Sequence, residues 1–183
     1  MGVDQKSRML AGELYLARDP QLVEDRARCE QLNRSFNAEA DPDKRSSLLR
    51  LLLGAVGERV DVRSPFACDY GFNIVLGDGV FVNFGAVILD CASVVIGDGC
   101  QIGPGVQLLA ADHPRQADLR RQGWEMAEPI RLGRNVWVGG GVIVCPGVTI
   151  GDDAILGAGS VVTRDIPAGV LAVGCPARVV REL

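Results

Sequence analysis

The sequence is poor in histidine, in aromatic residues and in net charge, and each shortage excludes a class of function. His113 is the only histidine among 183 residues, so a site that needs several histidine ligands on one metal ion is disfavoured. The formal net charge is only −4, and lysine and arginine are scattered along the chain. A nucleic-acid-binding protein would gather its basic residues on one face, so we expect no nucleic-acid partner.

Long apolar runs and paired cysteines are also missing. No stretch approaches the roughly 18–20 apolar residues that span a bilayer, and the start, Met1–Lys6, lacks the apolar segment of a secretory signal. We therefore expect a cytoplasmic protein without a membrane contact. The six cysteines are irregularly spaced and form no C-x-x-C motif, which favours buried or half-buried free thiols over a zinc site or a disulfide framework.

Branched aliphatic residues recur at every sixth position, a spacing that fits neither an α-helix nor a half-buried strand. Hexapeptide β-helix repeats have this period, with a short strand and a turn in each unit. Glycine follows four of the six aliphatic positions, as tight turns require. The aliphatic positions of this series are Leu132, Val138, Val144, Ile150, Leu156 and Val162.

The same spacing occurs upstream in two further series, separated by a slip of two residues. If three units form one triangular coil, stacked coils place the aliphatic side chains in internal columns, where each buried side chain contributes roughly 1.5–3 kcal/mol. Because one coil cannot bury its own face, about three or more are needed. The period predicts a mainly β fold but does not give its handedness. These series are Leu76, Val82 and Ile88, then Ile96, Ile102 and Leu108.

The first part of the chain has a helical pattern instead. Asp19-Pro20 and Asp41-Pro42 each place an N-cap residue before a proline in the first helical turn, and apolar residues with helical spacing follow. We expect residues 1–57 to form a helical cap over an open end of the β-helix, with residues 58–183 as the β-helix and its C-terminal tail. The second helix is expected to end at Gly54 or Gly57. The repeat is interrupted at about 109–131, which predicts an inserted loop that contains His113.

Eight segments spread over nearly the whole chain form a recognisable set of motifs: Met9–Tyr15, Cys68–Ile74, Asn83–Phe84, His113–Pro114, Asn135–Gly140, Pro146–Gly151, Gly159–Pro167 and Gly174–Arg178. They resemble the motifs of the maltose and galactoside O-acetyltransferases. The repeats alone indicate a broad superfamily, whereas the cap and the Cys68–Gly71 segment are similar to the sugar O-acetyltransferases. This resemblance implies a left-handed parallel β-helix and a homotrimer with active sites between subunits.

The resemblance implies that acetyl-CoA is the acetyl donor, that no metal is required and that His113 is the general base. A sugar hydroxyl is too weak an acid to ionise near neutral pH, whereas imidazole, with an ordinary pKa near 6.5, can accept its proton during attack. The amide of Gly140 is the implied donor to the tetrahedral oxyanion. For Gly139 alone, a place at a β-helix corner is an equally sufficient explanation.

Further site residues are implied by the same resemblance. Asp69 and Asn83 match positions that contact the sugar acceptor, although Asn83 can also be a simple turn residue. Glu125 lies in the same loop as His113 and can orient the imidazole, bind a hydroxyl or lie in solvent. For coenzyme A, arginine side chains suit the phosphates. Arg178 and Arg181 can instead belong to a solvated tail, and Trp137 can instead lie at a contact between subunits. The matching positions are Trp137, Gly140, Ala158, Thr163, Arg164, Arg178 and Arg181.

The sequence also departs from the family at positions that line the site. Ala17, Gly85 and Cys91 stand where some members have polar residues, so the acceptor and the hydroxyl that is acetylated are the least defined features. Glucose or maltose is the preferred acceptor, and galactosides, amino sugars or a non-sugar alcohol stay open. A non-catalytic β-helix scaffold is the main alternative function. A zinc hydratase of the γ-carbonic-anhydrase type would need more histidines.

Overall fold

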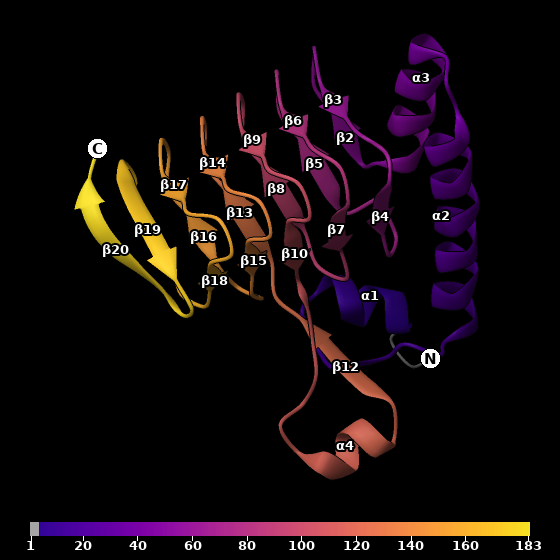
Figure 1. Cartoon of the computed structure of the whole chain (residues 1–183). Coiled ribbons are helices and arrows are strands. Elements are labelled where there is room, and N and C mark those ends of the chain that lie inside the picture. Colours follow the sequence, from indigo (N-terminus) through magenta and orange to yellow (C-terminus); the bar gives the residue numbers. More distant parts are fainter. Residues whose placement is uncertain (1–3) are drawn as a thin grey trace.

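The computed structural model describes residues 4–183 and shows a β-helix of about six turns with helices at its N-terminal end (Figure 1). Residues 1–3, which belong to the start and to the predicted cap, lie outside the described residues. Three sheets form the faces of the solenoid, and the chain visits them in a fixed order. Their strands are parallel except at the C-terminal edge, where the last two strands are antiparallel. The predicted mainly β fold, a left-handed parallel β-helix of hexapeptide repeats with a helical cap and an inserted loop, is confirmed.

We call the three faces sheets I, II and III. Sheet I contains β2 (Ala55–Val56), β5 (Ile74–Leu76), β8 (Val94–Ile96), β13 (Ile130–Leu132) and β16 (Thr149–Ile150). Sheet II contains β3 (Asp61–Val62), β6 (Phe81–Val82), β9 (Gln101–Ile102), β14 (Trp137–Val138), β17 (Ile155–Leu156), β19 (Val170–Gly174) and β20 (Ala177–Glu182). Sheet III contains β4 (Phe66–Cys68), β7 (Ala86–Leu89), β10 (Gln107–Leu109), β15 (Ile143–Val144) and β18 (Val161–Val162).

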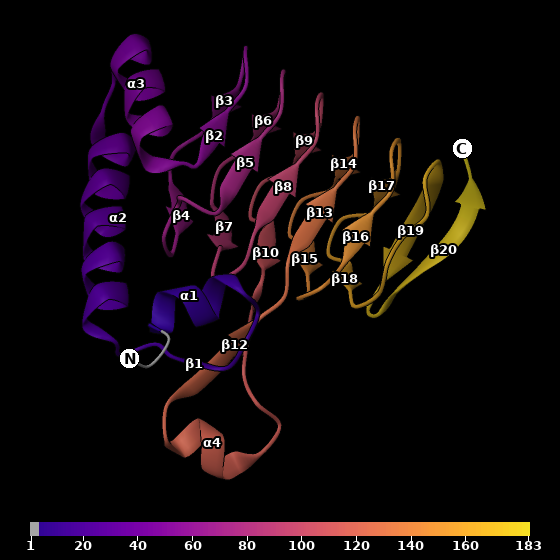
Figure 2. The same ribbon diagram turned by 180° about the vertical axis from the view of Figure 1, so that it is seen from behind.

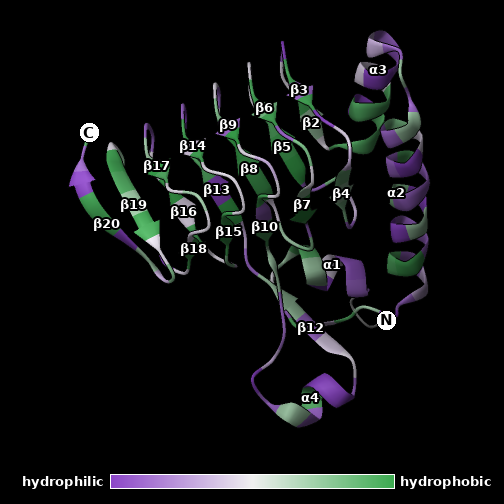
Figure 3. Ribbon diagram, viewed as in Figure 1, coloured by the Kyte–Doolittle hydropathy of each residue, from purple (hydrophilic) through white to green (hydrophobic). Residues whose placement is uncertain are grey.

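The aliphatic residues of the hexapeptide repeat stack in one internal column for each sheet. In sheet I, Ile96 pairs with Leu132, and Leu132 pairs with Ile150 in the next coil. All of these side chains are buried, as are their counterparts in the other two sheets. The strands are therefore mostly hydrophobic along the solenoid, whereas α2 alternates between hydrophobic and hydrophilic turns (Figure 3).

The cap helices begin where the sequence predicts. α2 (Pro20–Ala38) has Asp19 as its N-cap, and the carboxylate accepts a hydrogen bond from the Gln21 amide at 3.0 Å. α3 (Pro42–Leu52) begins after Asp41 in the same way and ends just before Gly54. A further helix, α1 (Gln5–Leu10), and two short strands, β1 (Tyr15–Leu16) and β2, also lie in the segment that was expected to be helical. The division of the chain into two units at residue 57 stays a prediction.

Polar side chains of the cap bind the first strand of each sheet, where backbone groups would otherwise be left without partners. Asn37 accepts a hydrogen bond from the Phe66 amide of β4 at 2.9 Å and donates one to the Phe66 carbonyl at 2.8 Å. Arg45 donates to the Val62 carbonyl of β3 at 2.8 Å, and Arg50 donates to the Val56 carbonyl of β2. Because unpaired strand edges recruit other strands, these contacts close the N-terminal end of the solenoid.

The inserted loop leaves the solenoid after β10 and returns at β13. It contains β11 (Ala111–Asp112), α4 (Ala117–Arg121) and β12 (Trp124–Ala127), which were not predicted as separate elements. β12 lies between β11 and β1, so a small antiparallel sheet joins the loop to the N-terminal segment (Figure 2). None of the helices formed by residues 4–183 combines the length and the apolar character needed to cross a membrane.

All six cysteines are free thiols. Five of them are buried or half-buried, as expected. For Cys175 the prediction is wrong, because this residue lies exposed in the turn between β19 and β20.

Replacement of Asn37 by alanine should destabilise the protein, because the substitution leaves the Phe66 amide without its acceptor and removes a donor to the Phe66 carbonyl. We expect a loss of about 2 kcal/mol in the free energy of unfolding and a greater tendency to associate through the freed edge of β4. Urea unfolding and light scattering measure the two effects. Gln31→Ala, on the exposed face of the same helix, is the matched control. Equal stability of the two variants would contradict a role of Asn37 in closing the edge.

Candidate active site

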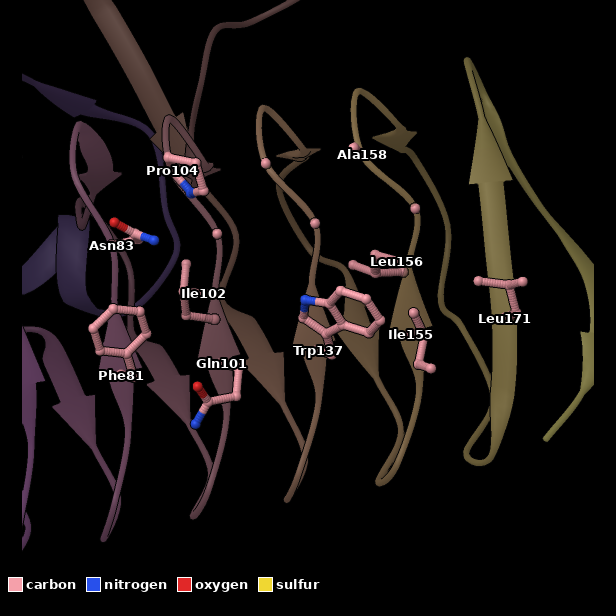
Figure 4. A pocket seen from close by; sticks show the side chains of 14 residues that line it. Phe81, Asn83, Gln101, Ile102, Pro104, Trp137, Ile155, Leu156, Ala158 and Leu171 are labelled. Atoms are coloured by element: carbon pink, nitrogen blue, oxygen red, sulfur yellow. The ribbon is translucent and has the colours of Figure 1, made fainter.

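A groove of about 500 Å³ runs across the outer face of sheet II (Figure 4). Its floor is formed by outward-facing residues of five neighbouring strands, which the strand register places side by side. Each of these residues immediately precedes a column residue, so the strand alternation turns it outward. Apart from Trp137, the floor was not predicted from the sequence; apolar residues at outward positions of the repeat were the signal that could have found it. The floor residues are Phe81, Gln101, Trp137, Ile155 and Leu171.

One wall of the groove is the corner between sheets II and III. Asn83, Gly140 and Ala158 follow β6, β14 and β17 at this corner, and all three line the groove. Asn83 is half-buried, and its side-chain oxygen accepts a hydrogen bond from the Phe84 amide at 2.8 Å. The structure therefore brings together four of the predicted site residues, counting Trp137.

The backbone at this corner leaves one amide free. The Gly139 N–H is donated to the Leu156 carbonyl and the Gly141 N–H to the Pro104 carbonyl, each at 2.8 Å. The Gly140 N–H between them has no acceptor within residues 4–183. Gly140 also has no side chain, so a ligand in the groove can approach this donor closely.

A second polar cluster lies where the cap, the corner between sheets III and I, and the inserted loop meet. The Tyr15 hydroxyl donates to Glu125 Oε2 at 3.0 Å, and the Cys91 thiol donates to Asp69 Oδ2 at 3.5 Å. Tyr15 and Cys91 are buried, whereas Asp69 and Glu125 are half-buried and can reach a ligand. Asp69 and Glu125 were predicted as site residues from the sequence, whereas the contribution of Tyr15 and Cys91 was not.

Burial dominates the electrostatics of this cluster. Burial raises the pKa of Asp69 above its ordinary value, and the Glu125 carboxylate adds to the rise, against the Cys91 hydrogen bond and the Arg26 charge. Burial also raises the pKa of Cys91 to about 12, so the thiol stays protonated and serves as a donor.

The turn that carries Asp69 is held by the fully buried carboxylate of Asp90. Asp90 accepts hydrogen bonds from the amides of Asp69 at 3.1 Å, Tyr70 at 2.9 Å and Asn73 at 3.2 Å. Burial raises the pKa of Asp90, and the backbone donors oppose that rise. The backbone of Asp69 is thus fixed by Asp90 while its side chain is bound by the neighbouring Cys91.

His113 is exposed and lies just after β11, at the base of the inserted loop. Its amide donates to Asp112 Oδ1 at 2.7 Å, so the Asp112 side chain holds the local turn. Asp112 also forms an ion pair with Arg115. In residues 4–183, no three side chains of the usual metal-ligating types are gathered into one cluster.

Two protein-family models match this chain, one in the N-terminal cap and the other in the repeats. A model described as the maltose acetyltransferase hexapeptide capping motif matches residues 8–57, and one described as the bacterial transferase hexapeptide, with six repeats, matches residues 129–164. Nodulation protein L of Rhizobium meliloti (strain 1021) is 49% identical over 96% of this chain and 97% of its own length.

Two solved structures extend the likeness to the fold. A maltose O-acetyltransferase from Clostridium difficile 630 is 44% identical, with a TM-score of 0.97 over 100% of this chain and 99% of its own. A galactoside acetyltransferase in complex with coenzyme A is 40% identical, with a TM-score of 0.95 over 99% of this chain and 92% of its own. The chain belongs to the maltose and galactoside O-acetyltransferase family.

Within a single subunit of this sugar O-acetyltransferase, the predicted site residues lie at different corners. Asn83, Gly140 and Ala158 follow strands of sheet II. Asp69, Thr163 and Arg164 follow strands of sheet III, as does the loop that carries His113 and Glu125. The length of a sheet III strand separates the two corners.

The two C-terminal arginines lie on β20, beside the end of the groove. Arg181 is paired with the floor residue Leu171, and Arg178 is paired with Val173. Both arginines are exposed. The C-terminal segment is therefore a strand of sheet II and not a detached tail.

Two adjacent glycines of this acetyltransferase should respond differently to replacement by alanine. A Cβ at Gly139 would lie 2.6 Å from the Ala158 nitrogen and 2.8 Å from the Leu156 oxygen, so two coils would have to move apart. We expect Gly139→Ala to lower the free energy of unfolding by about 1–3 kcal/mol or more. At Gly140 the nearest atom is Pro104 Cγ at 3.3 Å, and the loss should be smaller. Thermal unfolding of both variants checks this order, and a more stable Gly139→Ala variant would contradict it.

Proposed function

We propose that this sugar O-acetyltransferase transfers the acetyl group of acetyl-CoA to a hydroxyl of glucose or maltose, with His113 as the general base. The observation that carries the proposal is the end-to-end likeness to the galactoside acetyltransferase whose structure contains coenzyme A. Glucose or maltose is preferred as the acceptor because of the Cys68–Gly71 segment and the likeness to a maltose O-acetyltransferase. The cellular location stays the prediction made from the sequence.

The groove on sheet II fits the elongated, partly apolar pantetheine arm of acetyl-CoA. Its floor combines the exposed Trp137 ring with the apolar side chains of Phe81, Ile155 and Leu171, which can cover such an arm. Arg181 and Arg178 lie on the strand at the end of the groove, where their guanidinium groups can bind phosphates. Thr163 and Arg164 lie at the other corner and would reach the donor from a neighbouring subunit.

The reaction follows from the groups at the two corners. The imidazole of His113 accepts the proton of the acceptor hydroxyl while the hydroxyl oxygen forms a bond to the thioester carbon. The free Gly140 N–H donates to the oxyanion of the tetrahedral intermediate, a contribution that depends on the donor being in place before the charge develops. Collapse breaks the carbon–sulfur bond, and the imidazolium returns the proton to the sulfur of coenzyme A.

The acceptor is held by carboxylates and amides, which suit the many hydroxyls of a sugar. Asp69 and Glu125 are half-buried and grouped in one cluster, and each keeps oxygen atoms available for a ligand. Asn83, on the opposite corner, presents its amide nitrogen toward the groove side. Glu125 binds an acceptor hydroxyl in this proposal, since its carboxylate accepts a hydrogen bond from Tyr15 and not from His113.

We propose a homotrimer in which each active site is formed between two subunits. The support is geometric: Gly140 and Asn83 lie at one corner of the chain, whereas His113, Asp69 and Glu125 lie at another or in the loop beside it. A rigid stack of coils cannot bring its own corners together. The large apolar side chains of Trp137 and Phe84 are 55% and 52% exposed in the single chain, which suits a face that a neighbouring subunit covers.

Replacement of His113 by alanine should abolish most acetyl transfer, because it removes the group that accepts the hydroxyl proton in this proposal. We expect kcat to fall by about 10²–10⁴-fold, measured as release of the coenzyme A thiol with glucose, maltose, galactosides and glucosamine as acceptors. In the native enzyme kcat/KM should fall on acidification, since protonated imidazole cannot accept a proton.

Gln116→Ala, an exposed change in the same loop, should keep native rates and serves as the control. A flat pH profile, or an active His113→Ala variant, would contradict the general-base role. If no thiol is released with any of these sugars, the result would point to a non-sugar acceptor or to a scaffold.

Mixed trimers test whether the site spans two subunits. His113→Ala lacks the base and Asn83→Ala lacks an acceptor contact, so each should have low activity alone. Unfolded together and refolded as one mixture, they should regain about a quarter of the native activity, because random mixing gives both intact residues to about a quarter of the sites between subunits. Each variant treated alone should keep its own low activity, and sedimentation should give the mass of three chains. No recovery from verified mixed trimers would place both residues of a site in one subunit.

A further inference from the structure

The inserted loop is paired with a strand of the N-terminal segment. In the small sheet beside the solenoid, Tyr15 of β1 is paired with Glu125 of β12, and Leu16 is paired with Trp124. On its other edge β12 is paired with β11, where Asp112 lies opposite Met126, and His113 is the next residue along the chain. Strand β1 is thus bound directly to the strand of Glu125, which is in turn bound to the strand that ends at His113 (Figure 2).

The Tyr15 side chain also contacts Glu125 directly, through its hydroxyl oxygen. Its ring is fully buried, and its hydroxyl donates to Glu125 Oε2 at 3.0 Å. The Cys91 thiol also lies beside the hydroxyl and in turn binds Asp69. Burial raises the pKa of Tyr15 well above its ordinary value, so the hydroxyl stays protonated and acts as a donor.

Glu125 is left with one free oxygen. No hydrogen bond to its Oε1 is present among residues 4–183, while Oε2 is held by Tyr15. A glutamate in a loop has three rotatable side-chain bonds, and a single buried partner at its end selects one arrangement. The bond with Tyr15 therefore fixes where the free oxygen points.

We propose that Tyr15 is a positioning residue of the enzyme, which holds the Glu125 carboxylate at the acceptor site from the N-terminal cap. The proposal rests on the proposed function, in which Glu125 binds an acceptor hydroxyl. The cap then has two tasks: it closes the end of the solenoid, and through Tyr15 it aligns a substrate-binding group on the inserted loop. A ring without a hydroxyl would fill the same space but would leave the carboxylate unrestrained.

The test is Tyr15→Phe, which keeps the ring and removes only the hydroxyl. We expect kcat/KM for the sugar acceptor to fall about tenfold, the order expected for one lost hydrogen bond to a charged group, while KM for acetyl-CoA changes by less than about twofold. The unfolding temperature is measured in parallel, so that a loss of structure is recognised. An equal loss in the acceptor and the acetyl-CoA parameters would overturn the proposal.

A double-mutant cycle separates positioning from a general structural role. In a Glu125→Ala background the hydroxyl has no carboxylate to hold, so Tyr15→Phe should change kcat/KM for the acceptor by less than about twofold. Tyr70→Phe is the matched control, because its buried hydroxyl binds Arg26 at 2.7 Å and its removal should have the same factor in both backgrounds. An undiminished effect of Tyr15→Phe without Glu125 would show that Tyr15 acts through the fold.

The outcome also distinguishes this proposal from the proposed function. Native acceptor kinetics in Glu125→Ala itself would remove the role of Glu125 and, with it, the positioning role of Tyr15. Acetyl transfer and its dependence on His113 would be unaffected by that result, because they are measured with the native enzyme and His113→Ala.

Discussion

The close stacking of one coil on the next is the constraint on which the other features depend. At Gly133 the following coil is so near that a Cβ would lie 2.7 Å from the Asp152 nitrogen, and the Arg134 amide beside it donates to Asp152 Oδ1 at 2.8 Å. The same aspartate-to-amide contact recurs between Asp98 and the Asp78 amide. Such contacts set the register of neighbouring coils. Once the register is fixed, every residue of the repeat faces either the internal column or the outer surface, and the outward positions of five strands combine into one straight groove.

The same stacking creates a problem at its ends, because a coil with no predecessor has unpaired backbone groups. The cap solves it with side chains in place of strands: Asn37, Arg45 and Arg50 bind the first strands of the three sheets. Side chains can satisfy the edge without offering a new one, which a further strand would do. Because the cap must pack against the first coils for this purpose, its strand β1 also comes to lie beside the inserted loop. Closing the solenoid and aligning the loop are consequences of one packing arrangement.

Much of this architecture could be predicted from the sequence, since it depends on contacts of short and regular spacing. The sixth-residue period fixed the columns that contain Leu132, Val138 and Val144, and the Asp-Pro pairs marked the starts of α2 and α3. The pairing of Tyr15 with Glu125 could not be predicted, because 110 residues separate them and neither lies in the repeat. The groove was missed for a different reason. Phe81 and Ile155 are apolar residues at outward positions, but Gln101 stands at an equivalent position, so the outward positions repeat less strictly than the internal columns do.

Rigidity explains why the site is expected to need more than one subunit. A stack held by hydrogen bonds between all coils cannot bend its corners toward each other, so in the proposed trimer groups on different corners, such as Gly140 and Glu125, meet across two copies of the chain. Catalysis in such an arrangement depends on how accurately the two subunits dock. The inserted loop leaves the stack of coils between β10 and β13, so it needs a restraint of its own. The buried Tyr15 hydroxyl of the cap supplies this restraint. It acts on β12, the strand that carries Glu125, and leaves the exposed end of the loop, where α4 lies, free to vary.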